Sequence, residues 1–218
     1  MESVKTPHRL AVSITLAASV LIATVLLIPY PEKAQSENLP ENIKELLVKA
    51  PVPVEPFELV DQEKKPFNTA RLKGVWTLMF FGYTHCPDVC PTTLTELDNA
   101  ASRLNKINSG NNKLQYVFVS IDPQRDTPEL LGDYVSYFGA KFIAVTGEHE
   151  QLKQLANPLG IQYKIGIGFN KEYIVNHGSA MLLIDPEGRY YARFKAPHYA
   201  EEIVAGFKSL KIHYGESN

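Results

Sequence analysis

The chain has 218 residues and a formal net charge of −2 at pH 7, a length that suits one domain of ordinary size with appendages. Its lysines and arginines are scattered and its pI is about 6.3, which excludes an extended basic surface for nucleic acid. No nucleic-acid partner is therefore expected.

The N-terminal part contains an uncharged apolar run at residues 10–28. As a helix this run would be about 28 Å long, enough to cross a bilayer. Lys5 and Arg9 precede it, which favours a cytoplasmic tail at residues 1–9 and a single-pass anchor. A cleaved signal peptide is the alternative, but residues 32–34 lack a small residue at the first position of a cleavage site. We expect a bacterial inner-membrane protein with its soluble domain in the periplasm.

Residues 29–55 contain repeated prolines and predict a semi-rigid linker. The globular domain is expected over residues 56–214, opening with a small hairpin between Phe57 and Phe67. Val75–Gly82 is a continuous apolar run, which is typical of a strand buried on both faces. We predict that this run is a central strand.

Strands and helices alternate along the rest of the domain. The expected order is a helix after Pro91, a strand at Gln115–Ile121, a helix opening at Thr127, a strand at Phe142–Val145, a helix from Glu148 to Ala156, an irregular segment from Lys164 to Asn176, a hairpin of Ala180–Ile184 with Arg189–Phe194, and a helix from Tyr199 to Ile212. The alternation indicates parallel crossover units. We predict an α/β fold with a thioredoxin-like mixed sheet flanked by helices.

Cys86 and Cys90 are the only two cysteines, and they follow the predicted central strand. Residues four apart on a helical turn have Cβ atoms roughly 5 to 6 Å apart, so the two sulfurs can bond each other or hold one ion. Pro91 suits the first position of a helix, which would make Cys90 the N-cap and lower the pKa of the thiols. A structural disulfide is disfavoured because so short a loop adds little stability.

His177 is the candidate third ligand, since it lies just before the Ala180 strand, whose start faces the dithiol in a thioredoxin-like fold. A cis-proline usually stands there, but the chain has no proline between Pro158 and Pro186. Position alone leaves a solvent-exposed role for His177 equally open. Two thiolates and an imidazole suit copper, especially Cu(I), whereas structural zinc usually has four protein ligands.

The remaining polar candidates have simpler explanations. His85 adjoins Cys86 and can tune its thiolate, although its side chain is expected to point away. The other histidines are expected to be solvated: His8, His149, His198 and His213. Asp122 and Asp126 follow the neighbouring strand and are expected on the same rim. Helix capping and turn formation account for both, and support of the site or docking is the alternative.

Four segments together resemble the Sco/SenC family: Phe81–Leu94, Val119–Pro128, Tyr173–His177 and Leu183–Gly188. The resemblance runs from about Pro56 to Leu210 and implies a membrane-anchored copper-binding protein, not an enzyme, that assists assembly of the dinuclear copper site of cytochrome c oxidase. It implies Cys86, Cys90 and His177 as copper ligands. The family often has Asp where this chain has Asn176.

The implied partners are the oxidase subunit that carries the dinuclear copper site, and another copper carrier or a thiol reductant. The copper bound can be Cu(I), Cu(II) or both. The main alternative is a thiol-disulfide oxidoreductase that uses Cys86 and Cys90 as a redox pair and needs no histidine. A peroxidase is disfavoured, because Tyr83 stands where peroxiredoxin-type sites place threonine.

Overall fold

The computed structural model describes residues 39–107, 113–139, 141–167 and 173–217, which belong to one compact unit beginning at Leu39. The predicted tail at 1–9 and anchor at 10–28 lie outside these residues. Within the described part, no helix has the length and apolar character needed to cross a membrane.

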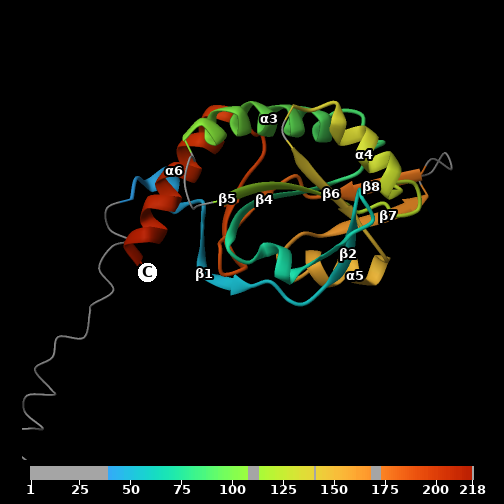
Figure 1. Ribbon diagram of the computed structural model, residues 1–218, viewed down its shortest axis with the longest axis horizontal. Helices are drawn as coiled ribbons and strands as arrows, with labels where there is room; N and C mark the ends of the chain where they lie inside the picture. Colours follow the sequence, from blue (N-terminus) through green and yellow to red (C-terminus); the bar gives the residue numbers. More distant parts are fainter. Residues whose placement is uncertain (1–38, 108–112, 140, 168–172, 218) are drawn as a thin grey trace, which may run out of the picture. The chain divides into compact units, whose positions relative to one another are not determined.

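A mixed sheet forms the centre of the domain (Figure 1). It has eight strands in the order β1-β10-β9-β4-β5-β6-β2-β3. Their bounds are β1 Leu47–Pro53, β2 Glu58–Asp61, β3 Pro66–Asn68, β4 Val75–Gly82, β5 Lys113–Ser120, β6 Phe142–Thr146, β9 Met181–Ile184 and β10 Arg189–Phe194. Strands β4, β5 and β6 are parallel to one another. Strand β9 is antiparallel to both of its neighbours, β4 and β10. The predicted crossover units and C-terminal hairpin are confirmed.

Helices cover both faces of the sheet. Their bounds are α2 Glu41–Lys44, the 3-10 helix η1 Thr69–Leu72, α3 Val89–Ile107, α4 Pro128–Ser136, α5 His149–Ala156 and α6 Ala200–Ser217. In Figure 1, α3, α4 and α6 lie along one face and α5 lies on the other. Thr127 caps α4, because its hydroxyl oxygen accepts a hydrogen bond from the Leu130 amide at 3.3 Å.

Strand β4 connects the two cores of the domain. Successive side chains of a strand point to opposite faces, so Trp76 and Phe80 pack under α3 and α6, whereas Met79 and Phe81 pack on the α5 side. These four side chains are all at most 2% exposed. Burial on both faces explains why the sequence of β4 is continuously apolar rather than alternating.

A separate two-stranded sheet carries His177. Strands β7 Tyr163–Ile167 and β8 Tyr173–His177 pair antiparallel, with Tyr163 opposite His177. The prediction of an irregular segment from Lys164 to Asn176 was therefore wrong for these strands. The glycines in this region obscured an apolar alternation that continues through Tyr163, Ile165 and Ile167.

The predicted linker also requires correction at its end. Residues 47–53 form the edge strand β1, which pairs antiparallel with β10, and Ile43 of α2 is buried in the core. Prolines at 51 and 53 suggested a linker, but an edge strand accepts proline because one side of its backbone has no strand partner.

Candidate metal centre

The two cysteines lie where β4 meets α3. Cys86 is in the loop that follows β4, and Cys90 is the second residue of α3. The helix begins at Val89 and its first turn includes a hydrogen bond from the Thr92 amide to the Asp88 carbonyl at 3.2 Å. Cys90 is therefore inside the first turn and is not the N-cap that Pro91 suggested. Proline is tolerated in this turn because its missing N–H would have no intrahelical acceptor.

The environments of the two sulfurs differ strongly. Cys90 is fully buried, whereas Cys86 is partly exposed. The Cys90 amide donates to the Cys86 sulfur at 3.4 Å, so the Cys86 sulfur occupies the position of an N-terminal helix cap.

The predicted lowering of the thiol pKa is wrong for Cys90. Burial raises the pKa of the Cys90 thiol well above its ordinary value, because a buried thiolate loses its hydration. A bound metal cation would instead supply the charge that stabilises the thiolate and would displace its proton.

Gly82, the last residue of β4, provides the space for the Cys90 sulfur. A Cβ atom at this position would lie 2.7 Å from the Cys90 Sγ and 2.8 Å from a ring carbon of Phe118. Any side chain would therefore displace the sulfur or the ring. Sequence reasoning did not single out Gly82, because a glycine at the end of a strand usually indicates a turn.

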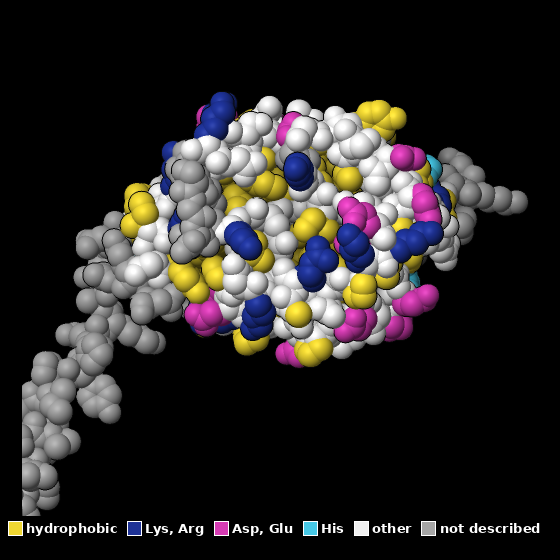
Figure 2. Space-filling model, in the orientation of Figure 1, with side chains coloured by type: hydrophobic (Ala, Val, Ile, Leu, Met, Phe, Trp, Pro, Cys, Tyr) yellow, Lys and Arg dark blue, Asp and Glu magenta, His cyan; other side chains and the backbone are white. Residues whose placement is uncertain are grey.

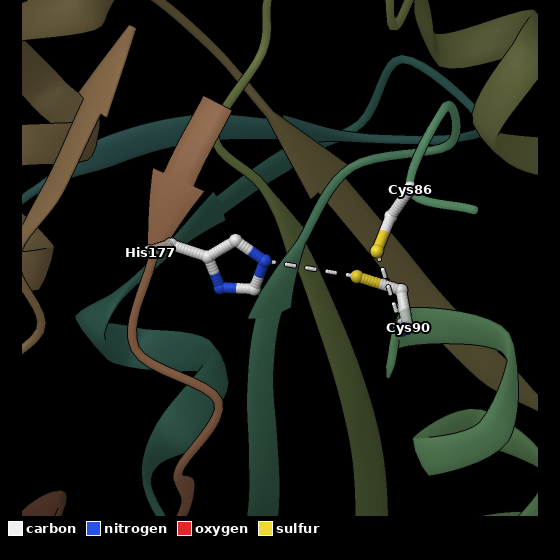
Figure 3. Close-up of side chains that lie close together, drawn as sticks. All are labelled: Cys86, Cys90 and His177. Atoms are coloured by element: carbon white, nitrogen blue, oxygen red, sulfur yellow. Dashed lines mark hydrogen bonds between the residues drawn. The ribbon is translucent and has the colours of Figure 1, made fainter. Parts of the chain in front are cut away.

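His177 is at the C-terminal end of β8 and its ring faces the cysteines (Figure 3). Its Nε2 lies 3.8 Å from the Cys90 Sγ, and its Nδ1 lies 2.9 Å from the Gly178 carbonyl oxygen. A carbonyl only accepts, so Nδ1 carries the proton that it donates and the neutral ring directs the Nε2 lone pair toward the sulfur. Burial lowers the pKa of His177, which favours this neutral, ligating form.

The structure thus brings together all three residues that were predicted as ligands. One ligand atom from each of Cys86, Cys90 and His177 lies within 4.8 Å of the others. Ligand atoms of a trigonal site with bonds of 2.0–2.3 Å would be about 3.8 Å apart, so only a small contraction is needed. Two sulfurs and one imidazole nitrogen form a soft donor set of low coordination number.

Two aromatic rings contact the imidazole of His177. The Tyr83 ring meets His177 edge-on with centroids 5.8 Å apart, and Phe80 does so at 6.5 Å. Burial, and then the neighbouring Cys86, raises the pKa of Tyr83. Sequence reasoning missed these contacts, because Phe80 reads as an ordinary core residue of β4. The rings restrict where the imidazole can move.

Comparison with known proteins identifies the family of this chain. A profile of the SCO1/SenC family matches residues 49–211, which is most of the chain. The chain belongs to the SCO1/SenC family. It is 39% identical over 158 residues to an SCO2-like protein of Rickettsia prowazekii, covering 71% of this chain and 75% of that relative. It is 32% identical over 187 residues to the mitochondrial SCO2 homolog of Homo sapiens, covering 82% and 70%.

Solved structures of other Sco proteins are similar to this chain. The crystal structure of Arabidopsis thaliana ScoI with copper bound is similar at a TM-score of 0.66 and 33% identity, over 72% of this chain and 98% of that one. The predicted thioredoxin-like mixed α/β fold is confirmed for this SCO1/SenC protein.

Asp122 and Asp126, which were expected on the rim of the site in this SCO1/SenC protein, are instead fully buried. Asp126 accepts hydrogen bonds from the Thr84 amide at 2.9 Å and from the hydroxyls of Thr84 and Ser120, each at 2.6 Å. Asp122 accepts from the Tyr173 hydroxyl at 2.7 Å and from Arg125 Nε at 2.5 Å. Sequence reasoning offered support of the site only as an alternative for these two residues and did not indicate their hydrogen-bond partners.

The other histidines lie outside the cluster of ligand atoms. His85 is exposed and its Nδ1 is 3.0 Å from the Thr84 hydroxyl. The prediction of a solvated His198 was wrong, because the side chain is buried and its Nε2 donates to the Ser179 carbonyl at 2.7 Å. His149 and His213 are partly buried, and His8 lies outside the described residues.

Proposed function

We propose that this protein binds a single copper ion through Cys86, Cys90 and His177 and transfers it to the dinuclear copper site of cytochrome c oxidase. The observation that carries the proposal is the convergence of two sulfurs and one imidazole nitrogen from segments far apart in the chain. The donor set suits copper better than zinc, which usually takes four protein ligands. A related protein, ScoI of Arabidopsis thaliana, has been crystallised with copper bound.

The exposure of the ligands supports transfer rather than storage. Cys86 and His177 are partly exposed, whereas Cys90 is buried. An incoming thiolate or imidazole of the acceptor can approach the copper from the exposed side and replace these two ligands in turn. Cys90 would then release the ion last, because its sulfur is the most deeply buried.

We further propose that residues 10–28 anchor the chain in the bacterial inner membrane and hold the copper-binding domain in the periplasm. The uncharged run and the two preceding basic residues support this arrangement. Lys, Arg, Asp and Glu side chains are interspersed on the face of the domain shown in Figure 2, which is consistent with a protein partner rather than nucleic acid.

X-ray absorption on the full chain, purified in detergent and loaded with Cu(I), tests the proposal. We expect one copper per chain with two sulfur ligands and one nitrogen ligand. His177→Ala should remove the nitrogen signal and lower copper retention against a chelator by at least about tenfold, while two thiols still titrate. His85→Ala is the matched control and should retain copper. Wild-type protein without copper, or His177→Ala with unchanged retention, contradicts the proposal.

A second function is favoured by the unequal exposure of the two thiols. The Cys86 thiolate can attack a partner disulfide, forming a mixed disulfide and expelling one partner thiolate. Cys90 then attacks the Cys86 sulfur, which releases the second partner thiolate and leaves Cys86 and Cys90 oxidised by two electrons. Cys90→Ser would trap the mixed disulfide on the oxidase subunit. This reaction should survive His177→Ala, whereas copper transfer should not.

A further inference from the structure

Asp126 is a buried carboxylate that the copper-binding role does not yet explain. It is fully buried, and in the described part of the chain no lysine or arginine pairs with it. The His85 Nδ1 lies 3.8 Å from its Oδ1. Burial of a charge is costly unless hydrogen bonds compensate it. The carboxylate must therefore derive its stabilisation chiefly from the amide and the two hydroxyls that donate to it.

Helix capping does not account for Asp126. The residue that caps α4 is Thr127, whose hydroxyl oxygen accepts from the Leu130 amide. The Asp126 side chain instead contacts two other segments at the carboxyl ends of β4 and β5. It accepts from Ser120 at the end of β5 and from both the amide and the hydroxyl of Thr84.

These hydrogen bonds hold the loop that carries Cys86. Thr84 is two residues before Cys86, and the next turn is closed by the Cys86 amide donating to the Tyr83 carbonyl at 3.2 Å. The loop is thus held at Thr84 by Asp126, which also bonds to Ser120 of β5, and it continues into α3 at Val89. Cys90 does not depend on this attachment, because the helix and the packing against Gly82 hold it.

We propose that Asp126 is a positioning residue of the metal centre: through Thr84 it holds the Cys86 sulfur within reach of Cys90 and His177. The inference rests on the proposed copper binding. Loss of the carboxylate leaves Cys90 and His177 in place and frees the Cys86 loop. Removal of such a supporting partner typically costs about 10- to 100-fold in metal affinity.

Asp185 offers a matched control. It is also fully buried, and it accepts from the amides of Glu187 and Arg189, each at 2.9 Å, and from Arg189 Nε. Asp185 follows β9, whose last residue, Ile184, pairs with Thr77 near the start of β4, whereas the metal centre is at the end of β4. Asp185→Ala therefore removes a comparable buried carboxylate far from the cysteines.

The experiment compares Asp126→Ala, Asp126→Asn and Asp185→Ala in the full chain. Cu(I) affinity is measured by competition with a chelator, and stability is measured by urea unfolding. The equilibrium of the Cys86–Cys90 disulfide with glutathione is measured in the absence of metal. Asp126→Ala should lose about 10- to 100-fold in copper affinity and form the internal disulfide less favourably. Asp126→Asn should stay within about threefold, because the amide can accept from the Thr84 N–H and donate to its hydroxyl. Asp185→Ala should lose stability but keep wild-type copper affinity.

The outcomes separate this inference from the proposed function. Wild-type protein that binds no copper overturns the proposed function, and the glutathione equilibrium then still tests Asp126. Asp126→Ala with unchanged copper affinity and disulfide equilibrium, or Asp126→Asn as impaired as Asp126→Ala, overturns the inference. An equal loss of copper affinity in Asp185→Ala also overturns the inference. Should Asp126→Ala not fold, Thr84→Val removes one of the hydrogen bonds and should weaken copper binding, whereas Thr84→Ser should preserve it.

Discussion

The cysteine loop, residues 83–90, and the histidine hairpin, β7–β8, supply the same site in different ways. The cysteine loop leaves the central strand β4 and continues directly into α3. The histidine hairpin is a separate two-stranded sheet, and His177 is 87 residues from Cys90 in the chain. The loop is therefore continuous with the main sheet, whereas the hairpin forms no strand pairing with it.

Polar contacts near both ends of β8 help to attach the histidine hairpin to the domain. The Tyr173 hydroxyl donates to Asp122, and the Arg125 guanidinium lies 4.1 Å from the centroid of the Tyr173 ring. Near the other end of β8, His198 holds the Ser179 carbonyl. Val175 of β8 is also buried in the core on the α5 side. The difference teaches that the sulfurs are placed by a loop continuous with the main sheet, whereas the imidazole is placed by apolar packing together with polar contacts of a hairpin that forms no strand pairing with that sheet.

Gly82→Ala should produce the largest effect and tests how strictly the core determines the position of Cys90. The new Cβ would lie 2.7 Å from the Cys90 Sγ, so we expect about 1–3 kcal/mol of lost stability from overpacking and at least about tenfold weaker copper binding. Urea unfolding and chelator competition provide the two measurements.

Gly206→Ala is the matched control for this substitution, because its Cβ would meet Phe194 at 2.7 Å, away from the sulfurs. It should lose comparable stability and keep its copper affinity. If both variants bind copper like the wild type, the sulfur position is more adaptable than the packing indicates.

Tyr173→Phe should have an intermediate effect and tests the attachment of the hairpin. The hydrogen bond to Asp122 is lost, which should cost about 1 kcal/mol of hairpin attachment. Copper affinity should then fall by up to about tenfold, with the thiol chemistry unchanged. The same substitution at Tyr116, whose hydroxyl donates to Asn105 of α3, should leave copper binding unaltered. Equal affinities in the two variants would show that Tyr173 does not place His177.

The pH dependence of stability should show the smallest effect. Burial lowers the pKa of His198, with smaller opposing effects from the Ser179 carbonyl and Glu202. Below the unfolded pKa of about 6.5, the unfolded chain gains a proton that the folded protein resists, so the stability of the metal-free protein falls as pH decreases. His198→Gln should reduce this slope in urea unfolding between about pH 7.5 and 5. A slope in His198→Gln identical to that of the wild type would contradict the assignment.

The cysteine side of the site was largely predictable, because its signals are local. The continuous apolar run at Val75–Gly82 identified β4 with its observed bounds, and the spacing of Cys86 and Cys90 placed both sulfurs on one turn. The prediction that was wrong on this side of the site was a lowered pKa for Cys90. The helix terminus is visible in the sequence, but the burial that opposes it depends on Phe118 and Gly82, which come from neighbouring strands.

The histidine side was less predictable. Position and the family resemblance pointed to His177, but glycines concealed the hairpin that carries it, and His198 read as solvated. Buried polar contacts such as Asp126 with Thr84 join residues 42 positions apart. No periodicity or local motif reports such a contact.

By itself, the sequence determined the cysteine pair, the strand that precedes it and the alternating order of strands and helices, because apolar periodicity and short spacings act between neighbours in the chain. The tertiary structure alone decided which sulfur is buried, which carboxylate supports the Cys86 loop and how the His177 ring reaches Cys90. Those properties arise when parallel strands bring distant loops to one edge of a sheet and exclude water from between them.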